Sequence, residues 1–166
     1  MNSTALWQRL ENQVHCMVGD FAGVAGVCLR DLTRGDGFAI QGDELFPTAS
    51  TIKIHVLTQL LLRAERGELD LRQPIQLTPE LRVPGSGVLT YLEGPLELTM
   101  LDVAILMIIV SGNTATNLCI DWAGMDETNT LLRQMGLTRT TLRRKMQDQT
   151  AVSENRQPRA FERVRL

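Results

Sequence analysis

The sequence predicts an α+β fold in which a mostly helical lobe follows a small antiparallel sheet. Apolar residues recur at helical spacing near the N-terminus and again between about residues 50 and 135. Between residues 24 and 40, two β-prone runs flank the turn-forming segment 33–37, as in a β-hairpin. With 166 residues, 43% of them hydrophobic, the chain can bury one sizeable core or two small lobes that share an interface.

The first two predicted helices lie on either side of this hairpin. Residues 6–18 form an amphipathic pattern behind Ser3, a residue type that commonly caps helices. After the hairpin, Pro47 precedes a long apolar helix over about residues 50–66. Gly67 follows it, where a left-handed residue is expected to end the helix. This second helix is predicted to be central to the fold.

Residues 70–94 contain three prolines and several turn-forming residues, so we expect a mostly irregular crossing there. Thr99 and Asp102 then resemble a capping box at the start of a helix over residues 100–110. This helix is apolar on nearly every face and is therefore expected to be buried all round. Two further helices are predicted, over residues 113–123 and 127–135.

Three segments follow from these elements. Residues 1–46 form a partial α/β lobe with a helix and a hairpin, so its sheet is incomplete. Residues 47–137 form an all-α lobe. Residues 138–166 are polar and basic with little periodicity, as expected of a loop and a C-terminal segment. Within this last segment, the basic run at residues 139–145 is expected to be a solvated loop in which Arg144 can form an internal salt bridge.

Composition and charge exclude several classes of protein. A formal charge of −2 argues against a general nucleic-acid binder. The longest apolar stretch, residues 103–110, is far shorter than the roughly 20 residues of a membrane-spanning helix. The first residues show no charged leader, so no signal peptide is expected. Three widely spaced cysteines lack the spacing of a zinc site, so we expect small buried thiols and neither a metal nor another cofactor.

Ser50 and Lys53 are the most informative pair in the sequence. A residue three positions along a helix lies on the same face, so the Lys53 amine can reach the Ser50 hydroxyl. Only Lys53 and Lys145 are lysines, and arginine does not lose its proton near neutrality. Lysine normally has a pKa of about 10.4, so a basic role requires burial to lower the pKa of Lys53. The alternative is a serine cap followed by a solvated lysine.

The segment Ser111-Gly112-Asn113 is a second candidate element of a site. It lies at the junction between two predicted helices, where polar side chains can point into a cleft. The alternative is an ordinary capped turn in which Asn113 is the cap.

Residues 46–54, 98–121 and 137–155 resemble the class A β-lactamase and penicillin-recognising serine hydrolase family. The family motifs are Ser-x-x-Lys, Ser-Asp-Asn and Lys-Thr-Gly. This chain has the first as Ser50 to Lys53 and a variant of the second as Ser111 to Asn113, with Gly112 in place of the aspartate. The resemblance implies a β-lactamase-like fold, with no cofactor or metal.

The resemblance also implies a role for each matching residue. Ser50 would be the acylated nucleophile and Lys53 its base. Ser111 would pass a proton to the leaving nitrogen, and Asn113 would bind the substrate amide. The implied substrate is a small-molecule β-lactam or an acyl-D-alanyl peptide, opened through an acyl-enzyme. Members of the family are usually periplasmic or secreted, which leaves the compartment of this chain open.

Two departures from the family limit what the resemblance implies. No Lys-Thr-Gly occurs, so the chain resembles about the first two thirds of the family and lacks the strand that supplies a second oxyanion N–H and a cationic group. Met146 stands where the family has the glutamate that activates the deacylating water, and Asp148 and Glu154 are the nearby carboxylates.

Three interpretations therefore remain open. The first is a β-lactamase-like hydrolase, and the second is a penicillin-binding peptidase-like acyltransferase with slow deacylation. The third is a catalytically inert scaffold, whose incomplete sheet would favour self-association through an exposed edge.

Overall fold

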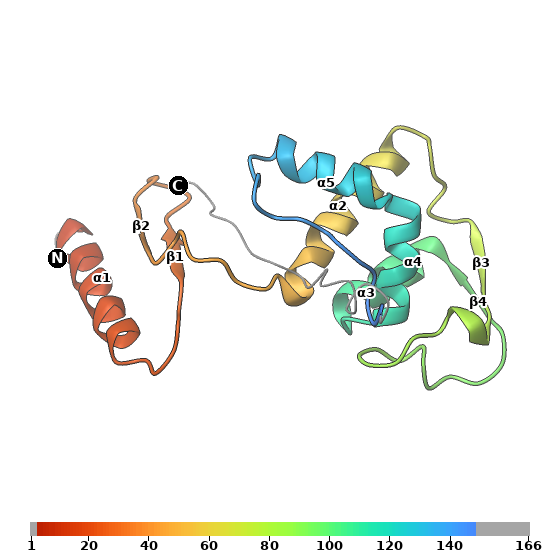
Figure 1. Cartoon of the computed structure of the whole chain (residues 1–166). Coiled ribbons are helices and arrows are strands. Elements are labelled where there is room, and N and C mark those ends of the chain that lie inside the picture. Colours follow the sequence, from red (N-terminus) through yellow and green to blue (C-terminus); the bar gives the residue numbers. More distant parts are fainter. Residues whose placement is uncertain (1–2, 149–166) are drawn as a thin grey trace. The chain divides into compact units, whose positions relative to one another are not determined.

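Figure 1 shows the computed structural model of the chain, which describes residues 3–148. Contacts between residues divide the chain into two units, and the division falls between Phe46 and Pro47. Among the described residues, the first unit holds one helix and a pair of strands, and the second holds four helices and another pair of strands. Each unit is described by itself.

The first unit consists of a helix and a hairpin, as the sequence predicts. Its elements are α1 (Ser3–Gly19), β1 (Val27–Arg30) and β2 (Gly37–Ile40). The two strands are antiparallel, with Val27 opposite Ile40. The ring of Trp7 on α1 meets the ring of Phe38 on β2 edge to face, with centroids 6.2 Å apart. This contact packs the amphipathic helix against the hairpin.

The second unit is mostly helical. Its helices are α2 (Ile52–Glu65), α3 (Met100–Ile109), α4 (Asn113–Ala123) and α5 (Met125–Gln134); its strands are β3 (Pro74–Leu77) and β4 (Leu96–Thr99); its 3₁₀ turns are η1 (Ala49–Thr51) and η2 (Pro79–Leu81). Helix α2 contacts α3, α4 and α5, so it is central as expected. Val56 and Leu60 on α2 are fully buried with Met107 and Leu132, and Gly67 follows the helix with a φ of 73°.

Strands β3 and β4 were not predicted from the sequence, which indicated an irregular crossing over residues 70–94. They pair antiparallel, with Pro74 opposite Thr99 and Leu77 opposite Leu96. Each strand has only four residues, and Pro74 occupies the first position, where proline is tolerated. Strands this short give little periodic signal.

The expectation that the helix over residues 100–110 is buried all round is wrong, because one face of α3 is exposed. Val103 and Met107 are fully buried, whereas Ile105 is 45% exposed and Ile109 is 68% exposed. The apolar sequence of the helix therefore predicts its length and position correctly. It does not show which of its faces the described part of the chain covers.

The cysteines also differ from the expectation of three buried thiols. Cys16 and Cys28 are exposed, and Cys119 is fully buried. Burial raises the pKa of the Cys119 thiol to about 12, since the thiolate would lose its hydration in the core.

Candidate active site

Ser50 lies in the 3₁₀ turn η1, directly before α2, and not in the first turn of the α-helix itself. The Thr51 hydroxyl donates a hydrogen bond of 2.6 Å to the carbonyl of Thr48, which holds the turn closed. Ala49 has a φ of 43°, a left-handed conformation that is unfavourable for alanine. The chain thus bends sharply where it presents the Ser50 side chain.

Ser50, Lys53 and Ser111 form one chain of hydrogen bonds. The hydroxyl oxygens of Ser50 and Ser111 are 2.8 Å apart. Lys53 Nζ lies 2.8 Å from Ser111 Oγ and donates a second bond of 2.7 Å to the Ser111 carbonyl. The structure therefore brings together the three residues that the sequence analysis selected as catalytic candidates, with Ser111 as the link between the other two.

Lys53 is buried, with only 3% of its surface exposed, although it carries an amine. Its two hydrogen-bond partners among the described residues are oxygens of Ser111, and both are neutral. Burial lowers the pKa of the Lys53 ammonium, because the charged form loses its hydration. Burial thus shifts the amine towards its uncharged form, which is the form that a basic role requires.

The turn that carries Ser111 is held by the segment before β4. The N–H of Asn113 donates a bond of 2.8 Å to the Ser86 carbonyl, and its side-chain Nδ2 donates one of 3.1 Å to the Pro84 carbonyl. A Cβ at Gly85 would collide with Asn113 Nδ2, and a Cβ at Gly87 with the backbone of the facing turn. Glycine at both positions lets the two segments lie in close contact.

A cavity of about 300 Å³ opens beside Ser50, and its lining includes the side of the turn at Asn113. The other lining residues come from positions 48, 49, 52 and 141–147. Asn113 thus lies in the same cavity as the candidate nucleophile. Within residues 3–148, its hydrogen bonds go to Ser86 and Pro84 and not to Ser50, Lys53 or Ser111.

Two asparagines hold the loop that forms one wall of this cavity. Asn129 accepts a bond of 2.8 Å from the N–H of Leu142 and donates one of 2.9 Å to its carbonyl. Asn117 pairs with Met146 in the same way, at 2.7 and 3.1 Å. The sequence analysis missed both residues, because their partners are 13 and 29 positions away and no local motif marks them.

Met146, which the resemblance matches to the family's water-activating glutamate, contributes a thioether to this site. Its side chain packs against the core cluster, and the residue also lines the cavity. Asp148 follows two residues later, and its use as a replacement base stays a prediction. Glu154 lies outside the described residues.

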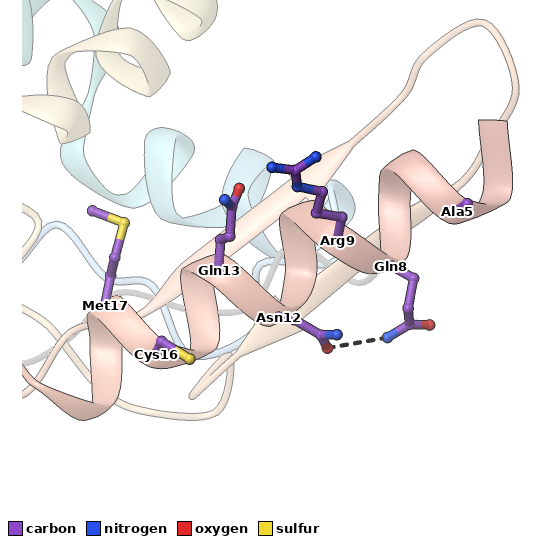
Figure 2. A pocket seen from close by; sticks show the side chains of 7 residues that line it. All are labelled: Ala5, Gln8, Arg9, Asn12, Gln13, Cys16 and Met17. Carbon is purple, nitrogen blue, oxygen red and sulfur yellow. Dashed lines mark hydrogen bonds between the residues drawn. The ribbon is translucent and has the colours of Figure 1, made fainter. Parts of the chain in front are cut away.

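Figure 2 shows a second hollow, an open groove along α1. Gln8 and Asn12 lie there, joined by a hydrogen bond of 3.3 Å, with Cys16 and Met17 further along the helix. All of its lining comes from one helix, and it holds none of the candidate catalytic residues. Within residues 3–148, no helix has the length and apolar character to cross a membrane, and no cluster of metal-ligating side chains occurs.

Comparisons with known proteins agree with this fold. A model of the β-lactamase enzyme family matches residues 8–163. The β-lactamase regulatory protein BlaB of Streptomyces cacaoi is 28% identical over 150 residues, which are 89% of this chain and 46% of that protein. β-Lactamase CARB-4 of Pseudomonas aeruginosa is 27% identical over 143 residues, which are 86% of this chain and 49% of that enzyme.

Solved structures of β-lactamases and penicillin-binding proteins are also similar to this chain. A β-lactamase from Sphaerobacter thermophilus superposes with a TM-score of 0.81 and 32% identity, over 95% of this chain and 57% of that one. A variant of PBP-A, solved as an acyl-enzyme complex with penicillin G, gives a TM-score of 0.79 and 29% identity, over 93% of this chain and 57% of that one.

These values confirm the predicted β-lactamase-like α+β fold. The chain spans about half the length of the curated relatives it matches. Because the family model covers nearly all of its residues, the chain belongs to the β-lactamase enzyme family.

Proposed function

We propose that this protein is a β-lactamase-like serine hydrolase that opens β-lactam amides through an acyl-enzyme on Ser50. The observation that carries the proposal is the hydrogen-bond chain from the Ser50 hydroxyl through Ser111 Oγ to the buried amine of Lys53. A hydroxyl becomes a competent nucleophile when a base can accept its proton during attack. The buried position of Lys53 supports that role.

The proton path follows from the donors and acceptors of an uncharged amine. One N–H of Lys53 bonds to the Ser111 carbonyl, and Nζ lies 2.8 Å from Ser111 Oγ, which is close enough for an uncharged amine to accept the Ser111 proton. As Ser50 Oγ attacks the lactam carbonyl carbon, its proton passes to Ser111 Oγ, and the Ser111 proton passes to Lys53. The reverse transfer through Ser111 then protonates the lactam nitrogen as the carbon–nitrogen bond breaks. An ester on Ser50 and a secondary amine are the products.

Asn113 is assigned to substrate binding because it lines the cavity that also contains Ser50. The side-chain amide can accept a hydrogen bond from the acyl amide of a substrate through its Oδ1. Its bond to the Pro84 carbonyl fixes the orientation of this amide before substrate arrives.

Met146 favours a second candidate function, a penicillin-binding peptidase-like acyltransferase that deacylates slowly. Hydrolysis of the ester needs a base for the attacking water, and a thioether cannot accept that proton. The similarity to a PBP-A variant that carries a penicillin G acyl group supports acylation as the step common to both candidates.

Incubation with a chromogenic cephalosporin, followed by intact mass, separates these functions. Sustained colour without a lasting adduct indicates a β-lactamase, and a persistent adduct on Ser50 indicates the acyltransferase. Ser50→Ala is the matched control and should remove both signals. If the protein shows neither colour nor adduct, the proposal is wrong and the inert scaffold is the better description.

A further inference from the structure

Residues 82–94, here called the support segment, are joined end to end by hydrogen bonds. The Arg82 guanidinium donates from its two Nη atoms to the carbonyls of Leu92 and Gly94. Between these ends, the Thr90 hydroxyl donates a bond of 2.9 Å to the Val83 carbonyl. The segment contains neither helix nor strand, so these side-chain bonds hold its backbone in place of a regular hydrogen-bond pattern.

The support segment also packs in the core and against the start of α4. Leu89 is 3% exposed and belongs to the core cluster. Thr114, in the first turn of α4, is 1% exposed. Its hydroxyl accepts a bond of 3.0 Å from the N–H of Val83 and lies 3.3 Å from the Val83 carbonyl oxygen. A buried hydroxyl costs free energy unless it is hydrogen-bonded, so Thr114 fixes where the segment meets α4.

Asn113 takes its position from the same segment. Its backbone N–H and its Nδ2 donate to the carbonyls of Ser86 and Pro84, at 2.8 and 3.1 Å. These carbonyls come directly after Val83, the residue that Thr114 holds. A shift of the segment at Val83 would therefore move both acceptors of Asn113.

We propose that Arg82 and Thr114 are positioning residues, which act through the support segment to set the position of Asn113 and its side-chain amide. This inference rests on the proposed function, in which Asn113 binds the acyl amide of the substrate. A group held in its binding orientation beforehand loses little conformational entropy when the substrate binds. Loss of this support should weaken the contact with the acyl amide in particular. A general disturbance of the site would slow acylation by every β-lactam alike.

Two penams that differ in the acyl amide test the inference. Benzylpenicillin carries a phenylacetylamino group on its lactam ring, and penicillanic acid has hydrogen there. Intact mass gives the second-order rate constant of Ser50 acylation for each, and the benzylpenicillin-to-penicillanic-acid ratio reports the contact with the acyl amide. Thr114→Val keeps the side-chain shape without the hydroxyl and should lower this ratio about three- to tenfold, as expected for loss of one hydrogen bond. Arg82→Gln should lower it too.

Matched threonine variants localise the effect. Thr114→Ser keeps the hydroxyl and should retain the ratio of the unsubstituted protein. Thr128→Val is the control, because Thr128 is also fully buried but its hydroxyl bonds to the Gly124 carbonyl, away from the support segment. Its ratio should not change. A ratio within one variant does not depend on the folded fraction of that variant.

A double-mutant cycle tests whether Thr114 acts through Asn113. Asn113→Ala should itself lower the ratio, and adding Thr114→Val to it should cause no further fall, since the amide to be positioned is gone. An unchanged ratio in Thr114→Val or in Arg82→Gln would overturn the inference. An equal further fall in the Asn113→Ala background would also overturn it.

If neither penam acylates Ser50, the proposed function fails and the inference is decided by hydrogen exchange. The backbone amide of Asn113, followed by NMR and compared with the Leu60 amide in the core, should exchange about tenfold faster in Thr114→Val, because its bond to Ser86 opens more often. Thr128→Val should leave this relative rate unchanged. Equal relative rates in Thr114→Val and the unsubstituted protein would contradict the inference.

Discussion

Replacing Lys53 by methionine tests the property on which the proposed chemistry depends, the uncharged state of a buried amine. Lys53 is 3% exposed, and its described partners are neutral oxygens of Ser111. Burial lowers the pKa of the folded protein's Lys53, whereas the unfolded chain keeps a pKa of about 10.4. Between these two values the unfolded state binds more protons than the folded state. The free energy of unfolding therefore rises with pH across this window and falls as pH decreases toward the folded pKa.

The magnitude follows from linkage. One titrating group contributes at most about 1.4 kcal/mol per pH unit, so from about pH 7 to about pH 9 the contribution changes by up to about 2.7 kcal/mol. Lys53→Met removes this contribution and keeps a side chain of similar length. It also removes two hydrogen bonds to Ser111, typically worth about 1 kcal/mol each, but that loss does not vary with pH. The stability of the variant relative to the unsubstituted protein should therefore be highest at the lower pH.

Urea unfolding of both proteins across this pH range measures the effect. Gln59→Met is the matched control, because Gln59 is a buried polar residue of the same helix and its side chain does not ionise. Its stability difference from the unsubstituted protein should change far less with pH. A pH-independent difference for Lys53→Met would refute the reasoning, since it would mean that folding does not disfavour the ammonium form. The proposed role of Lys53 as the base would then be wrong.

The remaining predictions concern deacylation, packing and thiol reactivity. Met146→Glu should shorten the lifetime of a penicillin adduct by about 10²-fold or more, because the carboxylate can act as a base for the attacking water. Met146→Gln should leave this lifetime unchanged. Intact mass followed over time measures both lifetimes. Gly87→Ala should lower the free energy of unfolding by more than about 3 kcal/mol, because its Cβ would collide with the Gly112 backbone. Gly136 has a φ of 81° but open space around it, so Gly136→Ala should lower the free energy of unfolding by only about 1–2 kcal/mol. Urea unfolding measures both values. With a chromogenic disulfide reagent at neutral pH, the two exposed thiols should react rapidly and Cys119 should not, because burial raises its pKa to about 12.

Features that depend on neighbouring residues were predictable from the sequence. Thr99 and Asp102 form the expected capping box, with bonds of 3.1 Å to the Thr99 hydroxyl and 2.9 Å to the Asp102 carboxylate. Gly124 and Gly136 adopt positive φ values directly after the predicted helices over residues 113–123 and 127–135. Caps and stops are local, because the interacting groups are within one helical turn.

Features that depend on distant residues were not predictable in the same way. The pairing of β3 with β4 joins segments about twenty residues apart, and neither strand is long enough to show alternation. The exposed face of α3 reflects which neighbours cover it, and the sequence of the helix does not contain that information. The hydrogen bonds from Asn117 and Asn129 to the cavity loop were not predicted, because their partners are distant in the sequence and an isolated asparagine in a helix forms no recognisable motif.

The candidate site shows how local and distant requirements combine. The spacing of Ser50 and Lys53 was recognisable because it is local, yet the described hydrogen bonds join them through Ser111, about sixty residues later in the chain. Ser111 has a φ of 54°, a conformation that typically costs about 1–3 kcal/mol for a residue with a side chain. In that conformation both its carbonyl and its hydroxyl bond to Lys53 Nζ, so the strained turn and the buried amine stabilise one another. The Ser-x-x-Lys spacing alone therefore leaves the alternative of a capped helix open, and the proposed role of Lys53 depends on the turn at Ser111.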